Sequence, residues 1–434
     1  VDTPGGTGVR SGLILLGLAS VPSRETWKYG VRGFRYTALD MGHLLGALLI
    51  SAARLRGALP NLRLAVLDGA SVAGSPFGLP NPATVVGVAA EERVSLSGRE
   101  YLEVVVALEW GIASDDDLAV RARDLLRQAA AQSECRPVPR PNRVFSSVLR
   151  NYVARWGWME MVEERTRAAR RGGPPADVVM QPATVAGPLA RLDAPALGAV
   201  VRQRRSELAF RAAAPLPCEI MLDILRSCAT QRLGGLFPSV ILGLTVTSVT
   251  GVSPGRYLVA PSASAVCPRL RRVIEEDYET VPELMGGTPD DLLLLRKREA
   301  AEVADLQAAA KTSSCHQQIA ADCGLTLAMF VHSRILCEHC REMHATDDAV
   351  GSDALREYIR GYWACGFLGH HAYLHATAGS AHCTGMGCYL DDMSAAHFGV
   401  LSILSPLYHM AVGIGCGERS PAFTYDREDL RTPK

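Results

Sequence analysis

Three adjacent side chains, Arg204-Arg205-Ser206, have the donor chemistry of a phosphate site. Each guanidinium group offers paired planar donors to an oxyanion, and the hydroxyl adds one more. We expect the triplet at the beginning of a helix, where the backbone dipole also favours a negative charge. A short basic cluster is more often a solvated face of a protein, so the triplet alone leaves both interpretations open.

A glycine-rich segment far downstream offers a second kind of contact. Cys383-Thr384-Gly385-Met386-Gly387-Cys388 precedes a strand-like run with an acidic pair, Tyr389-Leu390-Asp391-Asp392. Because Gly385 and Gly387 lack a Cβ atom, their backbone N–H groups can approach a planar ring closely. A flavin needs such donors near N5 and its carbonyl edge. A plain turn uses glycine in the same way, so this segment is also ambiguous by itself.

Two further sets of residues have spacings that could bind a metal. Cys337-Glu338-His339-Cys340 has C-x-x-C spacing with His344 nearby, but no second cysteine pair follows to close a tetrahedral zinc site. His371 and His375 lie one helical turn apart, and we expect their helix at an internal interface, where imidazole rings fill space. We therefore predict no metal site.

The order of segments around these residues occurs twice along the chain. A strand-like apolar run is followed by a helix, first at 11–20 and 36–48 and again at 324–333 and 361–374. Three shorter matches follow in the same order: 65–68 with 389–392, 77–79 with 398–400, and 85–88 with 411–414. Ordered self-similarity of this kind indicates a duplication in which one chain supplies both subunits of a dimer.

The interleaved helices and strands indicate an α+β fold with mixed sheets flanked by helices. We expect two halves that form an intramolecular pseudo-dimer. Residues 1–130 form a first, N-terminally incomplete copy, residues 131–189 a proline-rich linker and a bridging helix, and residues 190–434 a second copy. The chain begins at Val1, and we expect the first copy's counterpart of Arg204-Arg205-Ser206 to lie upstream of it.

Composition limits the class of protein. The chain has 434 residues, of which 48% are hydrophobic, and its 45 basic residues balance 45 acidic ones. This balance gives no global field for nucleic acid or an anionic membrane, so we expect a small-molecule or peptide-like substrate and no nucleic acid. No stretch approaches the roughly 20 uninterrupted apolar residues of a membrane span.

The twelve cysteines lack the regular spacing of a disulfide framework. We expect Cys365, Cys383 and Cys388 to be small buried apolar residues. Scattered thiols of this kind favour an intracellular reducing compartment, either the cytoplasm or an organelle such as a plastid.

Several of these segments together resemble the nitroreductase superfamily, and most closely its SagB-type branch of thiazole/oxazole-forming peptide dehydrogenases. The resemblance covers residues 11–90 and 190–415 in outline. The segments that carry it are Trp27–Tyr36, Arg204–Ser206 with Phe210, Thr250–Tyr257, Cys365–His370, Thr384–Gly387 and Pro406–Gly413.

The resemblance implies an FMN-dependent oxidoreductase whose flavin lies between two intertwined subunits. Hydride would pass between the flavin and a small-molecule or peptide-like substrate. By the family's pattern, Arg204, Arg205 and Ser206 would hold the phosphate of FMN. Gly385 and Gly387 would contact its ring.

The catalytic pair that the resemblance implies is Lys28 and Tyr29, where the family carries a Lys-Tyr pair implicated in the oxidation of azolines to azoles. Removal of a proton requires a positioned base, and either side chain can serve if burial or a neighbour shifts its pKa. At its ordinary pKa Lys28 would be protonated, so a surface lysine beside an interface tyrosine is the alternative. The second copy has Ser352-Asp353 at the equivalent place, so at most one of two sites could use this chemistry.

Two departures from the family's pattern motivate a second hypothesis. Leu208 stands where family members usually carry another basic residue, and the loop Phe237-Pro238-Ser239-Val240 lacks the usual glycines. The sequence therefore leaves two functions open. One is an FMN-dependent oxidoreductase with ping-pong turnover on an azoline-like heterocycle, a quinone or a nitroaromatic compound. The other is a flavin-free nitroreductase-like scaffold or subunit of a larger assembly.

Overall fold

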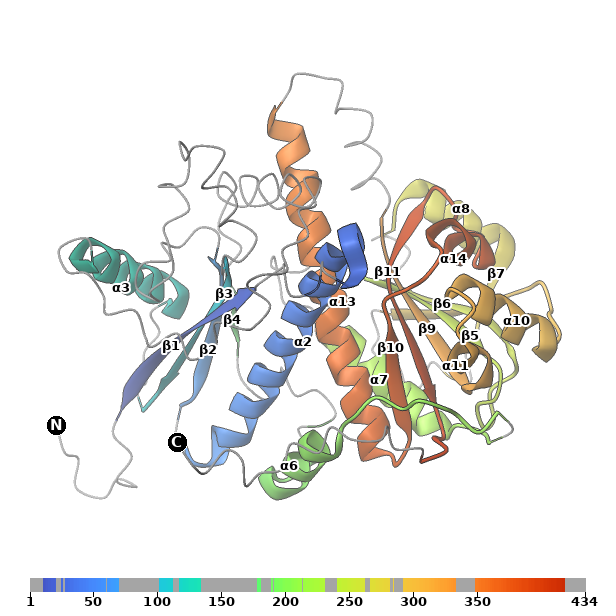
Figure 1. Ribbon diagram of the computed structural model, residues 1–434, viewed down its shortest axis with the longest axis horizontal. Helices are drawn as coiled ribbons and strands as arrows, with labels where there is room; N and C mark the ends of the chain where they lie inside the picture. The colour runs from blue at the N-terminus through green and yellow to red at the C-terminus, as the bar shows by residue number, and fades with distance from the viewer. Residues whose placement is uncertain are drawn as a thin grey trace.

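The computed structural model shows two β-sheets with helices between and around them (Figure 1), which confirms the predicted α+β class. The predicted mixed sheets are wrong, because all the strand pairs that the structure describes in these two sheets are antiparallel. The structure describes residues 11–20, 25, 28–59, 61–69, 101–111, 117–133, 178–180, 189, 191–212, 214–230, 240–261, 266–281, 284, 292–332 and 348–417. Predictions that concern 77–79, 85–88, 231–239, 333–347 and the bridging helix lie outside the described residues.

The smaller sheet has four antiparallel strands in the order β1-β3-β2-β4. The elements of this part of the chain are β1 (Gly12–Ser20), η1 (Gly30–Arg32), α2 (Gly33–Ala53), η2 (Arg54–Gly57), β2 (Arg63–Asp68), β3 (Tyr101–Trp110), α3 (Leu118–Ser133) and β4 (Val178–Met180). Strand β4 comes from the segment that the sequence assigned to the linker.

Both faces of the smaller sheet are covered, which explains why the middle of β2 and the middle of β3 are apolar. Successive side chains of a strand point to opposite faces. Leu64 and Val66 belong to the core that includes α2, whereas Ala65 and Leu67 pack in the cluster that includes α3. A strand buried on both faces cannot alternate between apolar and polar residues.

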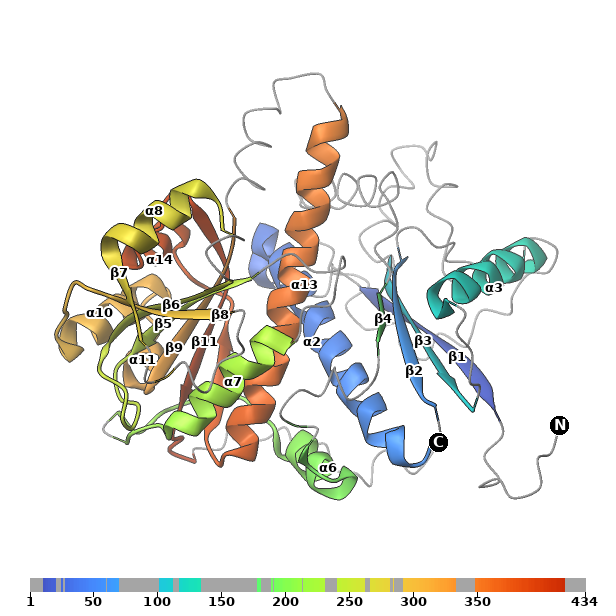
Figure 2. The ribbon, with the colours of Figure 1, turned by 180° about the vertical axis from the view of Figure 1, so that it is seen from behind.

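The larger sheet has seven antiparallel strands in the order β10-β11-β9-β5-β6-β8-β7. Its part of the chain contains α6 (Ala194–Gln203), α7 (Cys218–Thr230), β5 (Ile241–Val246), β6 (Gly255–Pro261), α8 (Pro268–Asp277), β7 (Tyr278–Thr280), β8 (Leu292–Lys297), α10 (Val303–Ser313), α11 (Gln318–Asp322), β9 (Leu325–His332), α13 (Asp348–Ala378), β10 (His382–Met386), α14 (Asp391–His397) and β11 (Leu404–Gly413). Figure 2 shows α7 beside α13 at this sheet.

Helices α2 and α13 lie side by side between the two sheets and run in the same direction (Figure 1). They approach so closely because glycine stands at the crossing on both helices. A Cβ atom on Gly42 would overlap the carbonyl oxygen of Trp363, and one on Gly366 would overlap that of Leu39. Any larger residue at either glycine would therefore push the two backbones apart.

The two sheets share one connectivity around these helices. In the smaller sheet the chain runs β1-α2-β2-β3, and β3 lies between β1 and β2. In the larger sheet it runs β9-α13-β10-β11, and β11 lies between β9 and β10. The inserted strand also has a bulge in both sheets, at Glu103 in β3 and at Leu407 in β11. By position in the sheet, β2 therefore answers β10.

One of the predicted sequence matches does not follow this correspondence. Ala65–Asp68 lies in strand β2, whereas Tyr389 and Leu390 follow β10 and Asp391 begins the helix α14. The pairing of 65–68 with 389–392 is therefore wrong by one element, and the strand predicted at 389–392 is absent. A short apolar run does not separate strand from helix by its pattern.

Helix α2, with 21 residues, is long and apolar enough to cross a membrane if only length and composition are considered. In the structure 56% of its most apolar 18-residue window is buried. Its buried side chains belong to the core shared with α13 and the smaller sheet, and this packing accounts for its apolar composition.

Candidate functional site

Arg204, Arg205 and Ser206 follow the C-terminal end of α6, which closes at Gln203. The prediction that the triplet lies at the beginning of a helix is therefore wrong, and so is the expected contribution of a helix N-terminus to anion binding. The end of a helix at which its carbonyl groups are free favours cations rather than a phosphate. From Arg204 the chain is extended, and Ser206 forms a parallel bridge with Cys383 of β10.

A threonine fixes this extended segment along the edge of β10. The Thr384 hydroxyl accepts a hydrogen bond from the backbone N–H of Glu207 at 2.9 Å and donates one to the Glu207 carbonyl at 2.6 Å. Because these contacts pair both backbone groups of Glu207, the side chains on either side have a defined direction. Ser206 therefore faces the same side of the sheet as Cys383 and Gly385.

Tyr373 of α13 joins three of the residues that the sequence singled out. Its phenol oxygen lies 2.8 Å from the Ser206 hydroxyl and accepts a hydrogen bond of 2.8 Å from the backbone N–H of Gly385. The guanidinium carbon of Arg204 lies 5.2 Å from the centre of its ring. Burial raises the pKa of Tyr373, so its phenol stays neutral at ordinary pH. The sequence did not predict this role of Tyr373, because the residue belongs to an apolar helical stripe.

A second tyrosine, Tyr408 of β11, covers Gly385 from the face of α2. A Cβ atom on Gly385 would overlap the Tyr408 phenol oxygen, which in turn lies 3.0 Å from Nε2 of His43. Burial lowers the pKa of His43 to about 3 and raises that of Tyr408, so both groups are neutral at ordinary pH. A neutral imidazole and a neutral phenol can share one hydrogen bond without an unpaired charge.

A third tyrosine connects Gly387 to the predicted catalytic pair. A Cβ atom on Gly387 would overlap the ring of Tyr36, whose centroid lies 4.4 Å from that of Tyr29. The Lys28 ammonium group lies 4.8 Å from the centre of the Tyr29 ring. We name the region formed by Tyr36, His43, Tyr373, Tyr408 and the two glycines Gly385 and Gly387 the β10 seam.

The surroundings of Lys28 do not favour its role as a base. A hydrogen bond to the Tyr29 phenol raises the pKa of Lys28, and the side chain is exposed. A lysine base requires a shift in the opposite direction, which burial or a neighbouring cation provides. The structure therefore brings Lys28 and Tyr29 to the edge of the β10 seam, and their catalytic role stays a prediction.

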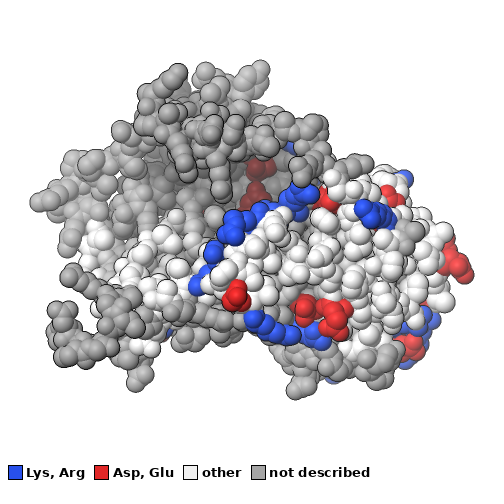
Figure 3. All heavy atoms as spheres, turned by 90° about the horizontal axis from the view of Figure 1, so that it is seen from below, with Lys and Arg blue, Asp and Glu red and all other residues white. Residues whose placement is uncertain are grey.

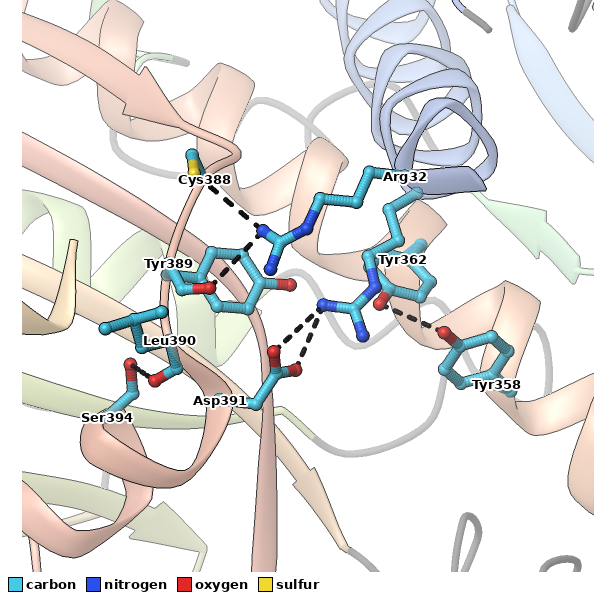
Figure 4. Close-up of polar contacts among 9 residues, drawn as sticks. Arg32, Tyr358, Tyr362, Cys388, Tyr389, Leu390, Asp391 and Ser394 are labelled. Carbon is cyan, nitrogen blue, oxygen red and sulfur yellow. Dashed lines mark hydrogen bonds and ion pairs between the residues drawn. The ribbon is translucent and has the colours of Figure 1, made fainter. Parts of the chain in front are cut away.

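Two arginines beside this pair bind the segment between β10 and the start of α14, a contact that the sequence did not indicate. Arg35 pairs with the Asp391 carboxylate at 3.0 Å, and Arg32 donates to the carbonyl of Tyr389 at 3.4 Å. Figure 4 shows Arg32 reaching from the first half toward Cys388 and Tyr389 of the second. Cys388 is exposed rather than buried as predicted.

Two of the polar groups that the resemblance would assign to FMN, the Ser206 hydroxyl and the Gly385 N–H, already have a partner within the protein. Tyr373 occupies both the Ser206 hydroxyl and the Gly385 N–H group, which would otherwise face a phosphate and a flavin ring. Tyr408 and Tyr36 fill the space that glycine leaves above Gly385 and Gly387. FMN would have to displace three tyrosine side chains, so the residues present do not fit the flavin.

The outer end of the segment is basic. Figure 3 views the molecule from the end at which α6 lies in Figure 1, and a band of Lys and Arg side chains crosses this face. Arg202 and Arg205 are exposed. Within the part of the chain that the structure describes, no carboxylate lies within ion-pair distance of Arg204 or Arg205. These side chains can accept an anion at the surface without giving up a partner.

The histidines considered as metal ligands are buried in α13. His371 and His375 have ring centroids 6.4 Å apart, and burial lowers the pKa of His375 to about 4. Among the described residues, no group of three or more metal-binding side chains comes together. The C-x-x-C segment at Cys337–Cys340 lies outside them.

No protein-family model matches the sequence, and no curated protein matches it. Several solved structures are similar in fold. A candidate nitroreductase from Anabaena variabilis shares 14% identity over 92% of this chain and 69% of its own, with a TM-score of 0.49. A candidate nitroreductase in complex with FMN, from Exiguobacterium sibiricum, shares 13% over 55% of this chain and 97% of its own, with a TM-score of 0.29.

A third similar structure is the Escherichia coli microcin synthetase McbBCD complex with truncated pro-MccB17 bound. It shares 14% identity over 48% of this chain and 69% of the matched chain, with a TM-score of 0.32. Two of these three similar structures are described as nitroreductases and the third as a microcin synthetase complex.

Proposed function

We propose that the chain is a doubled nitroreductase-like protein whose halves, residues 1–130 and 190–434, form an intramolecular pseudo-dimer. The shared connectivity of β1-α2-β2-β3 and β9-α13-β10-β11 supports this proposal. The helix crossing supports it further, because Gly42 meets the carbonyl of Trp363 just as Gly366 meets that of Leu39. A two-fold interface has this reciprocal pattern of contacts, in which equivalent residues exchange partners.

The same correspondence relates the β10 seam to a second region in the other half. The β10–β11 register pairs Met386 with His409, and its continuation by one residue puts Gly387 opposite Tyr408. Asp68 lies opposite Val104 in the β2–β3 pair, so Asp68 is the equivalent of Gly387. Tyr36 covers Gly387, and the equivalent residue of α13, Arg360, pairs with Asp68 at 2.9 Å. We name this second region, formed by Val66, Asp68 and Arg360, the β2 seam.

The β2 seam has lost the features that a ring-binding site needs. Val66 takes the place of Gly385, because Val66 pairs with Val106 as Gly385 pairs with Met410. A valine side chain keeps any planar ring away from the backbone N–H groups. The Asp68 carboxylate beside it is buried and already paired with Arg360.

We infer that the chain works without flavin, as a binding or structural subunit that retains the nitroreductase architecture. The closure of the β10 seam carries this inference, because the Tyr373 phenol satisfies both Ser206 and Gly385. Redox chemistry on a flavin requires an open surface beside these donors. In both seams the equivalent surface is filled by side chains of the protein itself.

Absorbance and FMN titration of the purified full chain test the inference. We expect a colourless protein that releases no flavin on denaturation and does not quench the fluorescence of added FMN. A yellow protein with about one FMN per chain would refute it. The variant Tyr36→Ala with Tyr408→Ala and Tyr373→Phe removes two of the side chains that close the seam and the hydroxyl of the third, and circular dichroism checks that it folds. If this variant binds FMN and the wild type does not, closure by the tyrosines is the cause.

The second candidate is the FMN-dependent oxidoreductase, and one observation favours it. Arg204, Ser206 and Gly385 converge on Tyr373, so the residues that the family's pattern assigns to FMN do lie together. This function requires that the tyrosines move when FMN enters. Flavin bound by the wild type, with reoxidation of the reduced protein by a quinone or a nitroaromatic compound, would establish it. Lys28→Ala and Tyr29→Phe would then test the predicted pair.

A further inference from the structure

We propose that Cys315 and Cys388 form a reversible disulfide and constitute a redox modification site at the edge of the β10 seam. This proposal does not depend on whether the chain binds flavin. Both cysteines are free thiols in the structure. Cys388 is exposed and Cys315 is partly exposed, so an oxidant in solution can reach them.

Backbone contacts hold the two segments beside each other. The N–H of Leu390 donates to the carbonyl of Ser313 at 2.8 Å, and the Gln317 side-chain amide donates to the carbonyl of Cys388 at 3.0 Å. Cys315 therefore lies between two residues that are bonded to the segment of Cys388. Burial, and after it the Cys388 side chain, raise the pKa of the Cys315 thiol to about 11, as expected for two neighbouring thiols.

The backbone at Cys315 is suited to a change at this position. Cys315 and the following His316 have φ angles of 54° and 60°, in the left-handed region that residues with a Cβ atom seldom adopt. They form the turn between α10 and α11. A turn can adjust the direction of one Cα–Cβ bond more easily than a helix, and a disulfide requires such an adjustment.

The two thiols have different surroundings, which sets the order of the reaction. Arg32 donates a hydrogen bond to the Cys388 sulfur at 3.8 Å, as Figure 4 shows, and a thiolate accepts this contact more strongly than a thiol. Cys315 is less exposed than Cys388, so an oxidant in solution reaches Cys388 more easily. Cys388 is therefore the sulfur that reacts first.

A hydroperoxide is the class of oxidant that fits this arrangement. The Cys388 thiolate attacks one peroxide oxygen, the O–O bond breaks, and a sulfenic acid and hydroxide form. The Cys315 sulfur then attacks the sulfenic sulfur, the S–OH bond breaks, and water leaves with the proton of Cys315. In total, two thiols lose two electrons and two protons, and one hydrogen peroxide becomes two waters.

The bond would act where the two halves meet. Gly387, next to Cys388, lies under Tyr36 of the first half, and Arg32 of the same half binds the Cys388 sulfur. A disulfide sulfur cannot become a thiolate, so oxidation removes the anionic form of Cys388 that Arg32 would bind most strongly. It also fixes the segment that supports Tyr36. The redox state of Cys388 thus changes how the first half is attached to the second.

The experiment treats the full chain with hydrogen peroxide, blocks free thiols, and maps linked peptides by fragmentation mass spectrometry. We expect a Cys315–Cys388 link, the loss of two free thiols per chain, and full recovery with a reducing agent. Cys315→Ser should stop at a sulfenic acid on Cys388 that dimedone traps, and Cys388→Ser should form no link. The matched control Cys416→Ser, at another exposed cysteine, should behave as the wild type.

Other outcomes overturn the proposal. They are oxidation that leaves both cysteines reduced while Cys416 reacts, or a link from Cys388 to a different cysteine. A disulfide formed by Cys315 with another cysteine in the Cys388→Ser variant would also overturn it. Amide hydrogen exchange in the oxidised protein gives a second measurement: exchange at residues 387–391 should slow, and unchanged exchange there would show that the bond does not stiffen the seam.

Discussion

The ion pair between Asp68 and Arg360 allows a sharp test of how the two halves meet. Asp68 ends strand β2 of the smaller sheet, and Arg360 lies in α13. The Asp68 Oδ2 atom and the Arg360 Nη2 atom are 2.9 Å apart, and the two residues are 1% and 8% exposed. Replacing Asp68 by Asn removes the negative charge and leaves the guanidinium group buried without a counter-charge.

The size of the effect follows from this burial. Removal of one partner of a buried pair costs about 3–5 kcal/mol, because the remaining charge has lost its water and its counter-charge. Replacement of both partners by apolar residues of similar volume is often nearly neutral. We therefore expect Asp68→Asn, Asp68→Leu or Arg360→Met alone to lower the free energy of unfolding by about 3 kcal/mol or more. The double variant Asp68→Leu with Arg360→Met should lose much less.

Urea denaturation of the full chain, analysed as a double-mutant cycle, measures these changes. The control is the pair Asp124–Arg127 of α3, which has the same 2.9 Å distance but side chains that are 52% and 75% exposed. Exposed pairs contribute about 0–1 kcal/mol, so Asp124→Asn should have little effect. If Asp68→Asn costs no more than Asp124→Asn, or the double variant shows no coupling, the halves do not meet as described.

Two further predictions concern the central helices. Gly366→Ala places a Cβ atom against the carbonyl of Leu39 and should lower the free energy of unfolding by about 1–3 kcal/mol. In the control Gly255→Ala, the nearest atoms to the new Cβ lie 3.6 Å away, and the free energy of unfolding should fall by about 1 kcal/mol or less. Equal effects of the two variants would contradict the close helix crossing. Burial lowers the folded-state pKa of His375 to about 4, below its ordinary 6.5, so its contribution to stability is complete above pH 6.5 and is lost as the pH falls toward 4. His375→Gln should therefore reduce the dependence of the unfolding free energy on pH, by up to about 1.4 kcal/mol per pH unit between 6.5 and 4, and an unchanged slope would show that His375 is not buried in neutral form.

Much of the fold could be predicted from the sequence because local patterns fix it. The apolar runs that begin at Gly12 and Leu325 form strands, and each leads to a central helix, as the repeated order indicated. The amphipathic pattern over residues 115–131 predicts a helix, and α3 spans Leu118–Ser133. These features depend on side-chain periodicity within one segment, which the sequence states directly.

The candidate site could be predicted only in part, because its state depends on contacts between distant segments. The family resemblance implied that Arg204–Ser206 and Gly385 belong to one site. In the structure Arg204, Ser206 and Gly385 all contact Tyr373. It did not indicate that Tyr373 and Tyr408 occupy their donors and the space between them. A tyrosine in an apolar stripe has the same sequence signal whether its hydroxyl meets a ligand or a neighbouring residue. Only the packing of helix against strand distinguishes the two.

The pairing of α2 with α13 has a consequence for synthesis of the chain on the ribosome. At roughly 5–20 residues per second, the ribosome needs on the order of 15–60 seconds to add the roughly 300 residues that separate the two helices. Throughout this time α2 presents the apolar surface that Leu39, Leu45 and Leu49 later bury. The smaller sheet cannot complete its core until the last quarter of the chain emerges, so nascent chains depend on protection by chaperones during that interval.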